Sequence, residues 1–238
     1  MKKLDVDHFL STKQEPSLFI IASPIGNLAD FTFRAVETLK MVDYIASEDT
    51  RVTGYLLKHY GIEKKNSMIS FHAQSGDRSL QKILALLAEG KSVAYLSDAG
   101  TPGISDPGTL LVMAAKQAGV KVIPLPGACA LTTALCAGGV ATHRFQFFGF
   151  LPHKKGRQTL LKDIALLSHT AVLYESTHRI EKFLGEVKEF FPLKKIVLAR
   201  ELTKIYEEFL TGTAEELLEI LHTTPEKKKG EFVVLVAE

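Results

Sequence analysis

The sequence has no apolar run long enough to cross a membrane. Its longest runs, such as residues 18–22, have the length of one β-strand, whereas a membrane-spanning helix needs about 20 apolar residues. The first 16 residues are charged and lack the continuous apolar stretch of a secretory signal peptide. We therefore expect a protein without a membrane anchor, in which residues 1–16 form a flexible leader.

Cysteine is scarce, and the two present, Cys129 and Cys136, lie seven residues apart. On a helix this spacing separates the Cα atoms by about 10 Å, which is too far for a disulfide. The eight histidines are scattered, and no Cys/His spacing resembles that of a zinc site. The sequence therefore predicts a reduced, cytoplasmic protein with no disulfide and no metal site.

Several binding and catalytic motifs are missing. The chain has neither a G-x-G-x-x-G fingerprint nor a P-loop lysine motif, and it has no G-x-S-x-G nucleophile elbow. These absences argue against a dinucleotide or triphosphate held at a helix N-terminus and against a serine hydrolase. The net charge of +2 is too small to predict nucleic-acid binding from the whole chain. The basic segments 153–162 and 226–230 fit either a solvated face or a phosphate contact.

The first half of the chain alternates strand and helix patterns. Helix 77–89, for example, has an apolar face of Leu80, Ile83, Leu84 and Leu87, and it ends at Gly90. Repeated strand–helix–strand units predict a mainly parallel sheet with helices on both faces. The expected strands are 18–23, 43–47, 68–71, 92–96 and 121–125, and the expected helices are 30–42, 52–60, 77–89 and 109–119.

The second half has closely spaced strands, which favours some antiparallel pairing and a mixed sheet. Thr213 and Glu216 have the spacing of a capping box at the start of a helix. Expected strands are 144–150, 171–174, 196–200, 207–210 and 232–237, and expected helices are 128–137, 157–168, 177–191 and 213–222. The turn-rich segment 124–127 separates the halves, so we expect two α/β domains, 17–127 and 128–238.

The most informative segment is YLSDAGTPGISDPG, residues 95–108. It ends a short apolar strand in glycine, proline and two aspartates, and a helix follows. Such loops build ligand sites at the C-terminal ends of strands in α/β proteins. A tight turn followed by a helix, with Asp106 as N-cap and Pro107 in the first helical position, explains the same residues equally well.

Two further strand ends in this half carry unusual chemistry, at residues 24–27 and 48–51. Each has an ordinary interpretation, because Asp30, Asp49 or Thr50 can cap the helix that follows. The C-terminal ends of parallel strands nevertheless lie at one edge of a sheet, so the three tips should converge on one crevice. Its acidic and backbone groups would suit a nucleoside or a cationic ligand.

The residues also resemble a known family. SPIGNLADFTFRA, ASEDTR, YLSDAGTPGISDPG, PLPGACA, GFLP, YESTHR, LARELTK and KKKGE occur in the order and spacing of the ribosomal RNA small subunit methyltransferase I family. That family belongs to the tetrapyrrole methylase superfamily, and the resemblance extends over about residues 18–236.

The resemblance implies an S-adenosylmethionine-dependent 2′-O-methyltransferase acting on a cytidine ribose in 16S rRNA near the decoding centre. It implies a homodimer of two-domain chains in which the cofactor lies between the domains. It also implies the following site residues. Cofactor contacts would be Pro24, Gly26, Ser97, Asp98, Ala99, Gly100 and Ile104, with Thr132, Thr133 and Tyr174 from the second domain.

On the substrate side, the resemblance places Glu48, Asp49 and Arg51. Because a ribose hydroxyl attacks well only when it loses its proton, we expect Asp30, Glu48 or Asp49 to position or deprotonate it. Arg51 would bind the adjacent phosphate. The residues after the third strand, FHAQSG, depart from the family's histidine-rich pattern, which argues against a catalytic role for His72.

RNA contacts are expected at the basic segments, and the shape of folded rRNA within the assembled small subunit would supply recognition. Two alternatives remain open. One is a tetrapyrrole C-methyltransferase, since a basic loop at 153–157 could meet tetrapyrrole carboxylates. The other is a non-catalytic ribosome-assembly factor. The expected RNA contacts are Lys154, Lys155, Arg157, Arg200 and the run 227–229, ending at Lys229.

Overall fold

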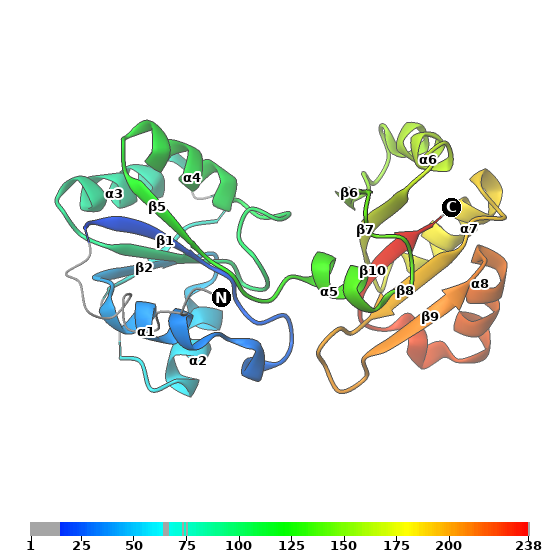
Figure 1. Ribbon diagram of the computed structural model, residues 1–238, viewed down its shortest axis with the longest axis horizontal. Coiled ribbons are helices and arrows are strands. Elements are labelled where there is room, and N and C mark those ends of the chain that lie inside the picture. The colour runs from blue at the N-terminus through cyan, green and yellow to red at the C-terminus, as the bar shows by residue number, and fades with distance from the viewer. Residues whose placement is uncertain (1–14, 64–66, 73, 75, 238) are drawn as a thin grey trace, which may run out of the picture. The chain divides into compact units, whose positions relative to one another are not determined.

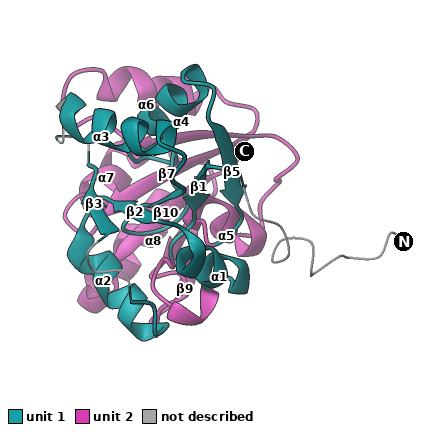
Figure 2. Cartoon of the chain, turned by 90° about the vertical axis from the view of Figure 1, so that its left-hand side faces the viewer, with its two compact units in different colours: residues 1–23, 31–127 teal, residues 24–30, 128–238 magenta. Residues whose placement is uncertain are grey.

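A computed structural model describes residues 15–63, 67–72, 74 and 76–237 of the chain. The expected leader therefore lies almost entirely outside the described residues. The described chain forms two compact units, coloured separately in Figure 2. The first contains the residues up to Ser23 together with Phe31–Gly127, and the second contains Pro24–Asp30 and the residues from Ala128 onward.

The first unit is built on a five-stranded sheet with the order β3-β2-β4-β1-β5 (Figure 1). Every strand pairing in it is parallel, which confirms the predicted parallel sheet. The strands are β1 (Ser17–Ile21), β2 (Tyr44–Ser47), β3 (Met68–Ser70), β4 (Val93–Leu96) and β5 (Lys121–Leu125).

Helices cover both faces of this sheet, as the alternating pattern predicts. Phe19 and Ile21 of β1 pack with α1 and α2 on one face. Leu18 and Ile20 pack with α3 and α4 on the other. Successive strand residues point to opposite faces, so a strand covered on both sides is apolar throughout. The helices are α1 (Phe33–Met41), α2 (Thr50–His59), α3 (Gly76–Ala88) and α4 (Gly108–Gln117).

Helix starts differ from the sequence-based expectations. Thr32, not Asp30, caps α1, because its side chain accepts a hydrogen bond from the Ala35 amide. Asp30 instead ends the short 3₁₀ helix η1 (Leu28–Asp30). Asp49 caps α2 through the Arg51 amide, so the helix starts before the expected Val52.

The second unit contains a mixed sheet with the order β6-β7-β10-β8-β9. The pairing of β6 with β7 is parallel and the other pairings are antiparallel, which confirms the predicted mixed sheet. The strands are β6 (Phe145–Phe150), β7 (Thr170–Ser176), β8 (Ile196–Arg200), β9 (Glu208–Gly212) and β10 (Glu231–Val236).

Helices pack on both faces of this sheet. Helices α6, α7 and α8 share the larger core cluster, and α5 packs on the opposite face. The capping box predicted at Thr213 and Glu216 is present at the start of α8. The helices are α5 (Ala130–Ala137), α6 (Arg157–Ala165), α7 (Ile180–Phe190), α8 (Ala214–Thr223) and the 3₁₀ helix η3 (Pro225–Lys228). Within the described ranges, no helix is long and apolar enough to cross a bilayer.

The segment Pro24–Asp30 belongs to the second unit, although the sequence-based boundary places it in the first. Its Ile25 packs against the core cluster that contains Leu131 and Leu202. Gly26, at φ 152°, lies against the side chains of Lys204 and Thr203, where a Cβ atom would have no room. The packing of this short segment, rather than its place in the sequence, decides its unit.

Candidate functional site

The C-terminal edge of the parallel sheet brings two of the predicted tips together. Ile21 of β1 and Ser47 of β2 are both in register with Leu96 of β4. The loops that follow these strands therefore start from neighbouring positions. A cavity of about 930 Å³ lies at the other edge of the sheet, where Tyr44 and Met68 begin their strands, and none of the predicted site residues lines it.

The loop after β4 is tied to the end of β1. Ser23 and Gly100 exchange two backbone hydrogen bonds, of 2.9 Å and 3.0 Å. The Ser23 hydroxyl donates to the Ser97 carbonyl at 2.7 Å, and the Ser97 hydroxyl donates to the Gly100 carbonyl at 3.0 Å. Gly100 has φ 79°, a conformation that favours glycine. Ser97 and Gly100 are buried in this arrangement, whereas Asp98 and Ala99 are exposed at the loop surface.

The acidic tip after β2 is joined to the same loop. The Asp49 amide donates to Asp98 Oδ1 at 2.9 Å, and the Asp98 amide donates to Glu48 Oε1 at 3.2 Å. Each carboxylate thus fixes the backbone of the other loop. The structure brings Glu48, Asp49 and Asp98 together, as the convergence argument predicts.

The neighbouring acids Glu48 and Asp49 differ in electrostatics. Asp49 Oδ2 lies 2.6 Å from Arg51 Nη2, and hydrogen bonds from Arg51 lower the pKa of Asp49 to about 2. The pKa of Glu48 is raised above 4.5, first by burial and then by the nearby Asp106 and Asp98 carboxylates, against the hydrogen bond from the Asp98 amide. Glu48 is therefore the better proton acceptor of the two.

Two buried hydroxyls lie in the strands that carry these acids. Among the described residues, Ser47 Oγ and Tyr95 Oη are buried and have no hydrogen-bond partner. Burial raises the pKa of Tyr95, and the carboxylates of Asp106, Glu48 and Asp98 raise it further. Tyr95 is thus held neutral next to the acidic edge, and no sequence pattern had singled out its hydroxyl.

Asp106 fixes the shape of the loop before α4. Its carboxylate accepts hydrogen bonds from the Gly103 amide at 2.8 Å and from the Gly108 amide at 2.6 Å. The N-cap position itself is Pro107, so the expected N-cap at Asp106 and first helical residue at Pro107 are each one position early. The Asp106 side chain nevertheless binds the amide of Gly108, the first residue of the helix, as a capping side chain would.

Tyr174, a predicted cofactor contact of the second unit, belongs to an aromatic cluster. Phe147 and Phe150 meet its ring edge-on, with centroid distances of 5.0 Å and 5.6 Å. Burial raises the pKa of Tyr174 to about 12, while a hydrogen bond from the Leu131 amide acts in the opposite direction. Its hydroxyl oxygen therefore meets the first turn of α5.

The other predicted cofactor residues lie as follows. The hydroxyls of Thr132 and Thr133 donate to the Cys129 carbonyl at 3.1 Å and 2.9 Å. Ile104 is half-buried in the loop before α4. Pro24 and Gly26, together with the catalytic candidate Asp30, belong to the second unit.

The expected RNA contact at Arg157 is wrong. Its side chain is only 4% exposed and lies 2.6 Å from Glu186 and 3.9 Å from Glu175. Its Nη1 atom also donates to the Pro152 carbonyl at 3.2 Å. The guanidinium is thus occupied inside the protein. It holds in place the loop that carries Lys154 and Lys155, which are both exposed.

The expected RNA contact at Arg200 is also wrong. This side chain is 9% exposed, pairs with Glu208 at 3.3 Å and donates to three backbone carbonyls. Within the neighbouring lysine run, Lys227 pairs with Glu208 at 2.6 Å and Lys228 with Glu181 at 2.8 Å. Lys229 is exposed.

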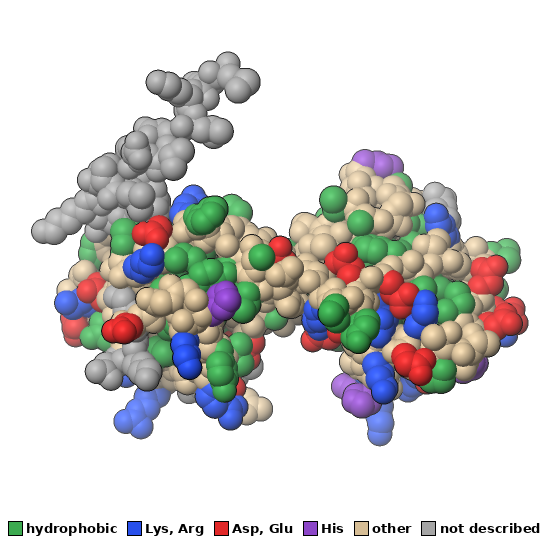
Figure 3. All heavy atoms as spheres, turned by 90° about the horizontal axis from the view of Figure 1, so that it is seen from below, with side chains coloured by type: hydrophobic (Ala, Val, Ile, Leu, Met, Phe, Trp, Pro, Cys, Tyr) green, Lys and Arg blue, Asp and Glu red, His purple; other side chains and the backbone are tan. Residues whose placement is uncertain are grey.

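Charge is not concentrated on the face shown in Figure 3, where acidic and basic side chains are interspersed. Among the residues that the structure describes, no group of three histidine, cysteine, aspartate or glutamate side chains could hold a metal ion. Glu48, Asp98 and Asp106 form no ion pair within the described ranges. The C-terminal edge of the sheet is therefore acidic, which suits a ligand with positive groups.

The fold defines a class of protein. The family model described as Tetrapyrrole (Corrin/Porphyrin) Methylases matches residues 17–218. A cobalt precorrin-4 methyltransferase superposes with a TM-score of 0.68 at 18% identity, over 93% of this chain and 94% of that one. A diphthine synthase superposes with a TM-score of 0.72 at 16% identity, over 92% of this chain and 89% of that one. At these identities the solved structures establish the fold alone.

Curated relatives narrow the class. The ribosomal RNA small subunit methyltransferase I of Haemophilus influenzae is 48% identical over 221 residues, which cover 92% of this chain and 77% of that protein. The protein of the same name from Escherichia coli O157:H7 is 44% identical over 231 residues, covering 96% and 80%. The chain belongs to the tetrapyrrole methylase family and, within it, to the ribosomal RNA small subunit methyltransferase I family.

Methyltransferases of this family use S-adenosylmethionine as methyl donor. The acidic edge of the parallel sheet fits this donor, because its sulfonium and amino groups are positively charged. Asp98 and Ala99 are exposed at this edge, and the Asp98 carboxylate offers a polar contact of the kind that such a ligand requires.

Proposed function

We propose that the chain is an S-adenosylmethionine-dependent 2′-O-methyltransferase that modifies a cytidine ribose of 16S rRNA near the decoding centre. The identity of 44–48% to relatives named ribosomal RNA small subunit methyltransferase I, over nearly the whole chain, carries this proposal. The joined acidic loops at Glu48 and Asp98 support it, because they supply both a cation-binding edge and a proton acceptor.

The cofactor residues of this proposal come from both units. In the first unit they are Ser97, Asp98, Ala99, Gly100 and Ile104, which follow β4. In the second unit they are Pro24, Gly26, Thr132, Thr133 and Tyr174. S-adenosylmethionine supplies a methyl group on a positively charged sulfur, which a nucleophilic oxygen can attack directly.

Glu48 is the proton acceptor of the proposed reaction. Transfer of the methyl group to the ribose 2′-oxygen would break the bond between the methyl carbon and the sulfonium sulfur and release S-adenosylhomocysteine, and the Glu48 carboxylate would take the proton that the hydroxyl loses. Asp49 is less suited, because Arg51 lowers the pKa of Asp49 to about 2. Arg51 has a side chain that is 85% exposed, so it can contact an RNA phosphate while it stays paired with Asp49. Lys154, Lys155 and Lys229 supply further phosphate contacts.

Nucleoside analysis of rRNA tests this proposal. Small subunits lacking the modification are incubated with the purified protein and labelled S-adenosylmethionine, and the rRNA nucleosides are separated by mass spectrometry. We expect label in 2′-O-methylcytidine. Label on a base, or transfer only to a tetrapyrrole added in parallel, would show a different methyltransferase, and absence of any transfer would favour an assembly factor.

The proposal includes a cytoplasmic homodimer. Sedimentation analysis at micromolar concentration should give twice the chain mass of 26.2 kDa. A monomer at all concentrations would remove the dimer from the proposal without affecting the reaction.

A further inference from the structure

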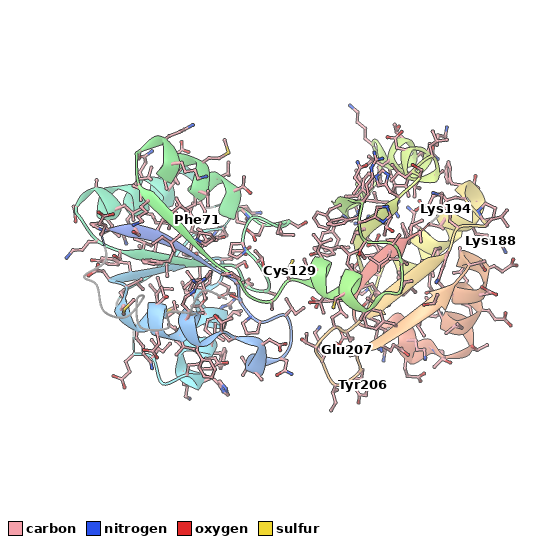
Figure 4. All side chains as sticks on the ribbon, viewed as in Figure 1. Phe71, Cys129, Lys188, Lys194, Tyr206 and Glu207 are labelled. Atoms are coloured by element: carbon pink, nitrogen blue, oxygen red, sulfur yellow. The ribbon has the colours of Figure 1, made fainter. Side chains whose placement is uncertain are left out.

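The loop between β8 and β9 exposes two large apolar side chains. Ile205 is 90% exposed and Tyr206 is 70% exposed. Figure 4 shows Tyr206 next to Glu207 at the end of this loop, beyond the strands that it connects. Large apolar side chains held in solvent at a loop tip are typical of a contact surface rather than of a core.

The backbone of this loop is held in one conformation. Glu201 and Thr203 have φ angles of 51° and 66°, which non-glycine residues adopt only where the surroundings enforce them. The Thr203 amide donates to Glu207 Oε2 at 2.5 Å. The Lys204 ammonium lies 2.9 Å from both Glu201 and Glu231. The tip is therefore ordered before any partner binds.

Arg200 joins this loop to the lysine-rich loop that follows α8. Its guanidinium donates to the carbonyls of Tyr206 at 3.2 Å, Glu226 at 3.0 Å and Lys229 at 2.7 Å. One buried side chain thus fixes the backbone at the aromatic tip and at the exposed Lys229. The carbonyl oxygens of residues 206 and 229 therefore both lie within hydrogen-bond distance of the same guanidinium.

An exposed aromatic ring on one loop, joined through Arg200 to a second loop that carries an exposed cation, suits single-stranded nucleic acid, because a base stacks on the ring while the cation meets the phosphate. We infer that Tyr206 and Ile205 form a stacking platform for an unpaired base of the RNA substrate, and that Arg200 positions this platform beside Lys229. The inference rests on the proposed function, since it assigns an RNA contact to the same enzyme.

A second copy of the chain is the competing partner for these side chains. A stable protein interface buries about 800 Å² on each partner, far more than the exposed parts of one tyrosine and one isoleucine supply. The exposed Lys229 on the joined loop supplies a positive charge that suits a phosphate backbone. The geometry therefore favours RNA.

The absence of tryptophan from the chain permits a direct test. Tyr206→Trp places a single fluorophore at the tip, and Leu193→Trp places one at a site that is 92% exposed at the opposite end of β8. Each variant is titrated at low salt with single-stranded rRNA oligonucleotides, while filter retention measures binding independently. We expect the fluorescence of the Tyr206→Trp variant to be quenched and that of the Leu193→Trp variant to remain unchanged. Retention without quenching, equal quenching of both or no retention would overturn the inference.

Steady-state methylation of small subunits gives a second measure. Tyr206→Ala should raise KM for the subunit between about fivefold and a hundredfold with kcat unchanged, whereas Tyr206→Phe should retain the wild-type KM. A fall in kcat alone, or a change from dimer to monomer in the Tyr206→Ala variant, would overturn the inference. If wild-type protein transfers no methyl group to rRNA, the proposed function itself fails, and the oligonucleotide titration still decides whether the tip binds RNA.

Discussion

At the scale of single residues, Glu48 and Asp49 show how adjacent acids acquire different chemistry. Asp49 caps α2 and pairs with Arg51, so its carboxylate is stabilised in the ionised form. Glu48 is partly buried, receives one backbone hydrogen bond and faces other carboxylates, so its ionised form is disfavoured. Of these two acids, Glu48 is the one that combines an accessible carboxylate with a pKa shifted toward neutrality.

Replacement of Glu48 tests this assignment. Glu48→Gln removes the proposed proton acceptor while keeping the acceptor oxygen for the Asp98 amide, and we expect kcat for methylation to fall at least a hundredfold. Asp49→Asn is the matched control and should lower kcat less than tenfold. The wild-type kcat should fall as the pH drops through the raised pKa of Glu48, above 4.5, and Glu48→Gln should lose this acid limb.

The sign of the stability effect supplies a further check. Because the pKa of Glu48 is higher in the folded state, the folded protein binds this proton more tightly, and ionisation of Glu48 reduces stability as the pH rises through that range. Glu48→Gln should therefore not lower the free energy of unfolding at neutral pH. Lower activity accompanied by substantial destabilisation would contradict the catalytic role.

The burial of Arg157 and Arg200 could not be predicted from the sequence. Basic residues in basic segments are equally compatible with RNA contact and with internal pairing. Arg157 follows two exposed lysines, yet Glu175 and Glu186, which enclose it, lie well over a dozen residues away in the chain. Arg200 ends an otherwise apolar strand, the only local sign of its burial. Ion pairs between residues so far apart in the chain cannot be predicted without knowledge of the fold.

Removal of Arg157 should be costly to stability. Glu175 is almost fully buried, and Arg157→Ala leaves its carboxylate with one partner fewer in a low-dielectric interior. We expect a loss of about 3–5 kcal/mol in the free energy of unfolding, measured by urea denaturation. Lys188→Ala removes the exposed pair with Glu215 and should cost no more than about 0.5 kcal/mol. Equal effects would show that Arg157 is not buried as described.

At the scale of elements, the sequence predicted the strands and helices well and their first residues less well. The parallel sheet could be predicted from apolar strands that lead into glycine-rich or acidic tips, because the spacing of apolar residues follows directly from which residues are buried. Helix starts depend on which of several polar residues captures a free amide, and Thr32 and Asp30 are equally good candidates by type. The segment Pro24–Asp30 was misplaced because its packing partners, such as Lys204, are remote in sequence.

The loop before α4 can be tested through Gly108. A Cβ atom at this position would meet Asp106 Oδ1 and Tyr95 Cε1, each at 2.8 Å. Gly108→Ala should therefore destabilise the protein by about 1–3 kcal/mol and weaken S-adenosylmethionine binding measured by calorimetry. Gly54→Ala, in a helix position with nothing within 4 Å, should instead stabilise by about 0.5–1 kcal/mol. Similar changes in both variants would exclude the proposed crowding.

At the scale of the whole molecule, the net charge of +2 does not show that some basic side chains are paired within the protein while others are exposed. Many of them are paired internally, as in the bonds of Lys227 and Lys228 to Glu208 and Glu181. Others, such as Lys154 and Lys155, are exposed on a loop that internal ion pairs hold in place. The amino-acid composition of the chain therefore does not show how many of its basic side chains contact an RNA phosphate.

Salt dependence measures that number for the proposed RNA complex. Each lysine that contacts a phosphate contributes about 0.7–0.9 to the magnitude of the slope of log binding constant against log salt concentration. The slope should become less steep by about that amount in each of three single variants, Lys154→Gln, Lys155→Gln and Lys229→Gln. In the triple variant it should become less steep by the sum of the three changes. Lys188→Gln, whose lysine pairs with Glu215, should leave the slope unchanged. Slopes that fall equally in all variants would mean that binding follows total charge, whereas a fall confined to the three loop lysines would locate the RNA path on those loops.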